Sequence, residues 1–188
     1  MSEDPPEAPG PLGLVEAFVN TVHLEDGDDS LPTPEAATAW LRRYGVAVES
    51  VSEAERARLI QLREALRDVL ESNDGRAVGA ERVEQVTRML NGHGLATVIS
   101  AEGVRLEPAG SGIDAFYGML ASAMVRATID GTWRRLKVCH KAECRWVFYD
   151  SSKNASRAWC SMRSCGCQAK SRAYRARRRD EQPSAAAS

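Results

Sequence analysis

The chain of 188 residues is long enough for one domain with a buried core and a smaller module. Its formal net charge of −1 hides two opposite halves. Residues 1–130 hold 11 Arg and no Lys against 22 Asp and Glu, a balance of −11, whereas residues 131–188 hold 14 Lys and Arg against 4 Asp and Glu, a balance of +10. An acidic body with a separate basic end is typical of a protein that binds a polyanion.

Neither a membrane protein nor a secreted one is predicted. No apolar run approaches the roughly 18 residues of a membrane-spanning helix, and the acidic, Pro-rich start lacks the basic and apolar parts of a secretory signal. We therefore expect a soluble, cytoplasmic protein that does not enter membranes.

The first structured elements are predicted to be helices. Residues 1–11 are rich in Pro and are expected to be disordered. Residues 12–22 carry apolar side chains at helical spacing and predict a first buried helix. Thr33 and Pro34 form a helix start, because Thr can accept hydrogen bonds from free N–H groups and Pro has no N–H to leave unsatisfied. That second helix is expected to end before Gly45.

The middle of the chain predicts two further helices. Ser52 and Glu55 form a capping box ahead of a long amphipathic helix. A shorter helix is predicted for residues 80–90, where the Gly-rich run that follows ends it.

A hairpin and a last body helix come next. Residues 95–100 and 104–106 are rich in β-branched side chains on either side of a Glu-Gly turn, which predicts two paired strands. Residues 113–129 predict a helix that closes the body and turns apolar side chains toward the core, namely Phe116, Tyr117, Leu120, Met124 and Ile129.

Several polar residues beside the apolar stripes of the body have two interpretations. They could line a pocket for a small acidic molecule. Alternatively, the Asn caps the first helix, and the arginines are solvated or pair with Glu64 and Asp68. The residues concerned are Asn20, Thr21, Arg63 and Arg67.

The cysteines predict a metal site. All five lie beyond residue 138, and four form two matched pairs, Cys139-x4-Cys144 and Cys160-x4-Cys165, with fifteen residues between the pairs. Two close pairs can bring four thiolates to one tetrahedral zinc ion at about 2.3 Å. Because no coordination position stays open, we expect a structural Zn2+ ion. The segment between the pairs is expected to form a hairpin, and the second pair to begin a helix with Ser161 as its N-cap.

Two residues near these pairs have less certain roles. Cys167 is a spare thiol, either redox-sensitive near a helix N-terminus or a small buried side chain. His140 is an alternative metal ligand.

The segment after Cys165 predicts a basic helix. The simplest function for this helix is to bind duplex DNA, with its arginines bridging phosphates across a groove. Its one aromatic ring, Tyr174, is too few for a platform on which single-stranded bases stack. RNA binding, a protein-interaction adaptor and docking on the acidic body remain alternatives. We find no nucleophile with a partnered base and no phosphate loop, so an enzyme is not expected. The candidate cations are Lys153, Arg157, Lys170, Arg172, Arg175, Arg177, Arg178 and Arg179.

Several segments together resemble a known family. RLKVCHKAECRWVFYDSSKNASRAWCSMRSCG followed by AKSRAYRARR, with LVEAFVNTV, LPTPEAATAWL and LIQLREALRDVL nearer the start, are similar to the bacterial CGNR-type zinc-finger proteins. Members begin with an ABATE domain and are described as stress-induced transcription regulators. The resemblance implies zinc ligands at Cys139, Cys144, Cys160 and Cys165, and a DNA-contacting helix after them.

The expected fold is mainly α (α+β), with an ABATE-like helical domain at residues 12–130. A treble-clef-like zinc module at residues 131–180 and a disordered tail at residues 181–188 follow it. The family signature Cys-Gly-Asn-Arg is replaced by Cys-Gly-Cys-Gln. If the family's Arg contacts DNA, Gln168 could contact a base edge but not neutralise a phosphate; if the Asn and Arg only brace the finger, little changes. For the body, the resemblance implies sensing of a signal or assembly, which leaves room for a homodimer and for a small-molecule effector.

Overall fold

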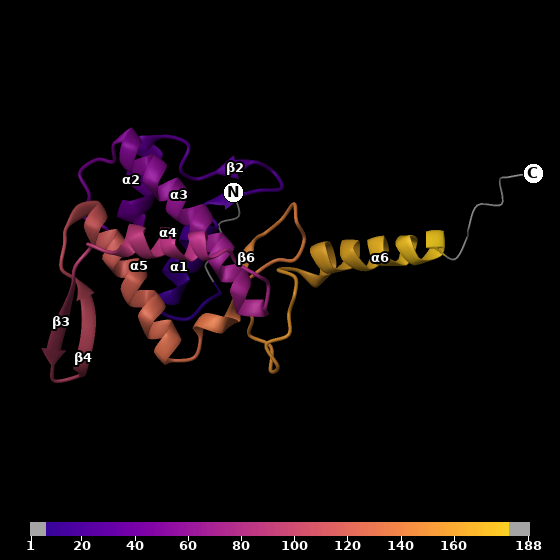
Figure 1. The fold of residues 1–188 in the computed structure, drawn as a ribbon. Helices are drawn as coiled ribbons and strands as arrows, with labels where there is room; N and C mark the ends of the chain where they lie inside the picture. Colours follow the sequence, from indigo (N-terminus) through magenta and orange to yellow (C-terminus); the bar gives the residue numbers. More distant parts are fainter. Residues whose placement is uncertain (1–6, 181–188) are drawn as a thin grey trace, which may run out of the picture.

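The computed structural model describes residues 7–180 (Figure 1). The disorder predicted for residues 1–6 and 181–188 lies outside the described residues. Within residues 7–11, Ala8 is packed against the body: it is buried, and its N–H donates to Glu16 Oε2 at 2.7 Å. The structured body therefore begins earlier than the sequence predicts.

The body is mainly helical, as predicted. A short pair of strands follows the first helix, and a 3-10 turn, η1, follows the third. The elements are α1 (Leu12–Val19), β1 (Val22–His23), β2 (Asp28–Asp29), α2 (Pro34–Arg43), α3 (Glu53–Leu70), η1 (Glu71–Asp74), α4 (Ala80–Leu90) and α5 (Gly112–Ile129).

The predicted helix starts are confirmed. Thr33 accepts a hydrogen bond from the Ala36 N–H at 3.3 Å, and Ser52 and Glu55 form a complete capping box. Helix α1 is shorter than expected: Asn20 is its C-cap, and the Thr21 N–H turns to Phe18 O at 3.2 Å, three residues back, before the chain enters β1.

Helix α5 differs from the prediction at its end. Phe116, Leu120 and Ala127 are buried, but Ile129 is 79 % exposed. Two residues along a helix correspond to about 200°, so Ile129 lies opposite the face that holds Ala127. The expectation that Ile129 points into the core was wrong.

The predicted hairpin is present as β3 (Leu95–Ser100) and β4 (Gly103–Pro108), paired antiparallel. Helix α5 packs against β4, and β3 forms the outer edge of the hairpin (Figure 1).

One hydrophobic core extends past the sequence boundary at residue 130. After the 3-10 turn η2 (Trp133–Arg135), strands β5 (Leu136–Val138) and β6 (Val147–Tyr149) pair antiparallel. Leu136, Val138 and Val147 are fully buried in the same apolar cluster as the side chains of α1, α3 and α5. The cysteine-rich module is therefore built onto the body.

Candidate metal centre and nucleic-acid interface

Four cysteines meet in one cluster. The sulfur atoms of Cys139, Cys144, Cys160 and Cys165 all lie within 4.8 Å of one another. The sulfur of Cys160 is 3.6 Å from that of Cys144 and 3.7 Å from that of Cys165. A tetrahedron with metal–sulfur bonds of about 2.3 Å has edges of about 3.8 Å, so the cluster fits one zinc ion.

The two cysteine pairs are held by different local structures. The first pair lies in the turn between β5 and β6, where the Cys139 N–H donates to Trp146 O at 2.9 Å. In the second pair, Cys160 precedes a π-helical turn, Met162–Gly166, and Cys165 lies within that turn, which leads into α6 (Cys167–Asp180). We expected a hairpin between the pairs, but the hairpin instead surrounds the first pair, because β5 precedes Cys139. The predicted cap is present: Ser161 Oγ accepts from the Ser164 N–H.

The thiols influence one another strongly. Hydrogen bonds from the thiols of Cys144 and Cys160 lower the pKa of Cys139, and the hydrogen bond with Cys139 raises the pKa of Cys144 to about 12. Four thiols this close cannot all ionise without a cation among them. The donor set therefore suits a divalent, thiophilic ion.

A glycine packs closely beside the cluster. Gly166 is buried, and a Cβ there would approach Met162 Sδ to 2.8 Å and Trp159 Cδ1 to 3.0 Å. The signature glycine that this chain keeps thus permits close packing under the metal site.

The two uncertain residues have defined positions. His140 Nε2 lies 2.7 Å from an Asp74 carboxylate oxygen, so His140 pairs with η1 rather than joining the four sulfurs. Cys167 is exposed, in contrast to the interpretation as a small buried side chain.

A buried ion pair, which the sequence reasoning missed, supports the loop between the pairs. Lys137 Nζ lies 2.9 Å from Asp150 Oδ2, and both side chains are buried. Burial opposes ionisation of Asp150, but hydrogen bonds from Ser152, Lys137 and the Arg157 N–H outweigh it and lower the pKa of Asp150 to about 2. The sequence signal that could have indicated this ion pair is a Lys within one apolar strand segment and an Asp directly after another.

Most of the predicted cations are displayed on the surface. Helix α6 projects away from the body (Figure 1), and its ion pair from Arg172 to Glu143, at 3.3 Å, stays within the zinc module. Arg178 lies over the ring of Tyr174 at 5.9 Å. The side chain of Arg179 lies outside the described residues. The exposed candidates are Lys153, Gln168, Lys170, Arg172, Arg175, Arg177 and Arg178.

Arg157 is placed differently from these cations. Its guanidinium donates to Cys160 O at 2.7 Å and lies 4.8 Å from the centre of the Phe148 ring. Arg157 therefore braces the loop before the second cysteine pair, and it is not among the cations exposed for a nucleic acid.

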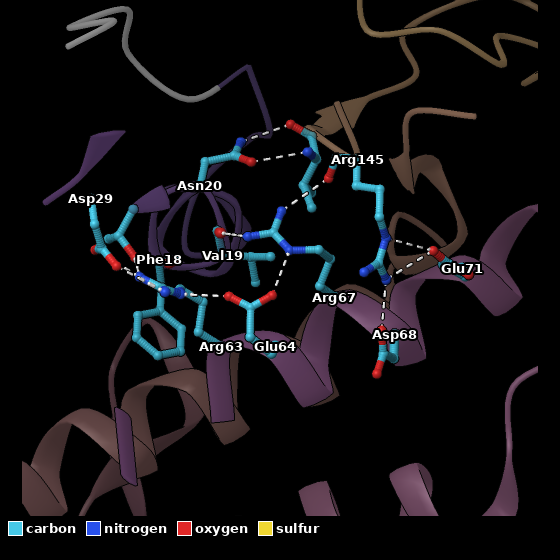
Figure 2. A network of polar contacts seen from close by, with 12 residues as sticks. Phe18, Val19, Asn20, Asp29, Arg63, Glu64, Arg67, Asp68, Glu71 and Arg145 are labelled. Atoms are coloured by element: carbon cyan, nitrogen blue, oxygen red, sulfur yellow. Dashed lines mark hydrogen bonds and ion pairs between the residues drawn. The ribbon is translucent and has the colours of Figure 1, made fainter. Parts of the chain in front are cut away.

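Buried polar groups join the body to the module (Figure 2). Arg67 on α3 is fully buried and donates to Val19 O at 2.5 Å, to Arg145 O at 2.9 Å and to a Glu64 carboxylate oxygen at 3.1 Å. Arg145, in the left-handed region at φ 45°, in turn pairs with Asp68 at 2.6 Å. One arginine of the body thus holds the loop that follows Cys144.

The side chain of Asn20 makes a second connection. It donates to Val147 O at 2.7 Å and accepts from the Val147 N–H at 2.9 Å (Figure 2). Because an amide can donate and accept at once, Asn20 pairs with β6 as a neighbouring strand would.

The predicted pocket residues are therefore engaged within the protein. Arg63 is buried and pairs with Asp29 at 2.8 Å, and its guanidinium also donates to Thr21 Oγ1. The second interpretation is confirmed in part: Asn20 is the C-cap of α1, and Arg63 and Arg67 both pair with Glu64, at 2.8 and 3.1 Å. Both arginines are buried, however, and not solvated. A cleft of about 810 Å3 does lie beside Asn20 and Thr21, but Glu7, Glu16 and Glu25 are among its lining, which disfavours an acidic ligand.

Comparisons with known proteins agree with this geometry. A family model described as "CGNR zinc finger" matches residues 135–178, and the ABATE model, described as "Putative stress-induced transcription regulator", matches residues 12–131. No curated protein matched the chain. Within the described residues, no helix is long and apolar enough to cross a membrane. The zinc finger and the four clustered cysteines together indicate one Zn2+ ion. Because the ABATE match covers more than half of the chain, the protein belongs to this family of transcription regulators, with an ABATE domain followed by a CGNR zinc finger.

Proposed function

We propose that the protein is a cytoplasmic transcription regulator that contacts duplex DNA through α6. The observation that carries this proposal is the position of α6: it starts at the four-cysteine cluster and leaves the acidic body. A helix of 14 residues is about 21 Å long and fits the major groove.

In this proposal Cys139, Cys144, Cys160 and Cys165 bind the zinc ion, whose part is structural. The four sulfur ligands fill the four positions of a tetrahedral zinc site, so no coordination position remains for a substrate. The metal fixes the start of α6 relative to the β5–β6 hairpin, and this hairpin is in turn fixed to the body by Asn20 and Arg67. The direction of the basic helix is thereby set by the body.

The exposed cations supply affinity that does not depend on sequence. Lys170, Arg172, Arg175, Arg177 and Arg178 are exposed along α6. Each cation that reaches a phosphate releases a counterion, so affinity should fall steeply with salt. Lys153 is exposed in the loop before the second cysteine pair, and in this proposal it is a flanking phosphate contact.

Gln168 is the residue proposed to contact a base. It is exposed in the first turn of α6, next to the metal site, and an amide can make two hydrogen bonds to an adenine edge. The resembling family has Arg at this position. We therefore expect this chain to differ from such relatives in target sequence more than in overall affinity.

The test is the salt dependence of binding to a random duplex and to selected duplexes. Arg175→Ala should reduce the log–log salt slope by about one, whereas Arg126→Ala, an exposed arginine of the body, should leave it unchanged. Gln168→Ala should change the ranking of duplex sequences without changing the slope.

Other outcomes assign the helix to a different partner. The absence of duplex binding at low salt would contradict the DNA proposal. Tighter binding to structured RNA, or binding to neither nucleic acid, would favour an adaptor role instead.

A further inference from the structure

The outer edge of the β3–β4 hairpin is a strand edge that the described residues leave uncovered. In this hairpin the Ala109 N–H donates to Gly94 O at 2.8 Å, so residues 94 and 109 form a hydrogen-bonded pair. Antiparallel pairs alternate between bonded and non-bonded. With Thr97 opposite Leu106, the backbone N–H and C=O groups of Leu95, Thr97 and Ile99 must point away from β4.

The opposite edge of the same hairpin is covered. Leu106 O, which points outward from β4, accepts a hydrogen bond from Ser122 Oγ on α5 at 2.9 Å. Gly118 of α5 lies so close that a Cβ there would come within 3.0 Å of Pro108. Helix α5 therefore protects β4, whereas β3 faces outward (Figure 1).

Strand β3 has none of the usual protection of an edge strand. Natural edges carry charges, Pro or bulges that prevent pairing with other strands. The six residues of β3, LATVIS, contain no charge and no Pro, and their register with β4 is continuous. Ile99 and its cross-strand partner Val104 are 78 % and 69 % exposed.

We propose that β3 pairs antiparallel with β3 of a second copy of this chain, about a twofold axis at Thr97. The outward groups of Leu95, Thr97 and Ile99 then meet one another in register. Thr97 lies opposite its own counterpart, Leu95 opposite Ile99, and Ala96 opposite Val98, so every pair is apolar or uncharged. A two-stranded hairpin becomes a four-stranded sheet, which is more stable in water.

A second copy fits this edge because it presents the same uncharged strand, whose outward donors and acceptors match about the axis at Thr97. Residues 1–130 carry a balance of −11, so most faces of two bodies repel each other. Pairing about Thr97 places this residue opposite its own counterpart, so a charge at position 97 would oppose its like. Strand β3 carries no charge, so pairing at this edge places no like charges opposite one another. This proposal does not depend on DNA binding by α6.

The test uses the full, zinc-loaded chain in sedimentation velocity over a range of concentrations. One strand pair buries less than a standard interface, so we expect a weak dimer, with a Kd on the order of 10 µM. Thr97→Pro removes a donor that points away from β4, so it should weaken the dimer by at least about tenfold and keep the hairpin. Thr97→Val, which keeps the backbone donor, should stay dimeric.

Two further measurements keep the proposal falsifiable if the Pro variant does not fold. Thr97→Lys puts two like charges on the axis and should also give a monomer. In the wild type, hydrogen exchange at the amides of Leu95, Thr97 and Ile99 should slow as concentration rises. A wild-type monomer at about 200 µM, a dimeric Thr97→Lys variant, or fast exchange at these three amides would each overturn the proposal.

Discussion

The two main hairpins of this protein are held in opposite ways. Strands β5 and β6 have three residues each, yet Leu136, Val138 and Val147 are fully buried. Strands β3 and β4 have six residues each, but Ile99 and Val104 are exposed. The shorter hairpin is fixed by a metal site, a shared core and side chains from the body, whereas the longer one depends on its own ladder and on α5. Strand length therefore does not measure how firmly a hairpin is held.

The largest effect should come from loss of the metal. Cys160→Ser leaves three thiolates and should abolish tight zinc binding, which contributes on the order of 10 kcal/mol to the folding of such modules. By hydrogen exchange, β5 and β6 should lose protection while β3 and β4 keep theirs. Cys167→Ser is the matched control, because Cys167 is outside the cluster, and it should retain one zinc per chain. Equal loss of protection in both hairpins would contradict the comparison.

Arg67→Met should have the next largest effect. The variant leaves the carbonyls of Val19 and Arg145 without their buried donor, and breaking such a network typically costs about 3–5 kcal/mol. Urea unfolding measures the change. Arg88→Met on α4 is the control, because both partners of its ion pair with Glu84 are exposed, and we expect at most about 0.5 kcal/mol. Similar costs for the two variants would show that the buried network is not specially important.

Asn20→Leu tests the amide that pairs with β6. It removes both hydrogen bonds to Val147 and should reduce the free energy of unfolding by about 1–3 kcal/mol. The measurement is denaturant unfolding with zinc bound. Asn91→Ala, at the exposed end of α4, should change stability little. If Asn20→Leu behaves like Asn91→Ala, the amide does not hold the module.

The smallest effect is expected at the exposed hairpin. Ile99→Thr keeps a β-branched side chain at a position 78 % exposed and should change the unfolding free energy by less than about 0.5 kcal/mol in dilute protein. Thermal unfolding at low micromolar concentration measures it. A loss above 1 kcal/mol would mean that this face packs against something even in the monomer.

Local signals in the sequence predicted much of the fold. The caps at Thr33 and Ser52 depend on neighbours within a few residues, and the structure has them as expected. The four cysteines were predictable for another reason: the matched spacing of the two pairs is itself typical of a metal site. Contacts between distant residues were not predictable in this way. Asn20 and Val147 are 127 positions apart, and no local pattern indicates that they meet.

The same limit explains the differences at the site. The pairing of Arg67 with Glu64 was among the interpretations of the sequence, but its burial was not, because a helix pattern does not distinguish a buried arginine from an exposed one. Ile129 was assigned to the core because it is apolar and lies in the predicted helix. In the structure, the last buried position of this helix is Ala127, two residues earlier. The direction of α6 relative to the body depends on tertiary packing, which the sequence pattern leaves open.

The burial of Leu136, Val138 and Val147 in the core of the body bears on how this protein can be rearranged. A zinc finger that folds alone can be moved between proteins as an independent domain. Here a graft of residues 131–180 onto another scaffold would expose three apolar side chains and leave the Val147 backbone without Asn20. Working chimeras would have to exchange the matching surfaces of α1 and α3 together with the finger, so the two parts are expected to have evolved as one unit.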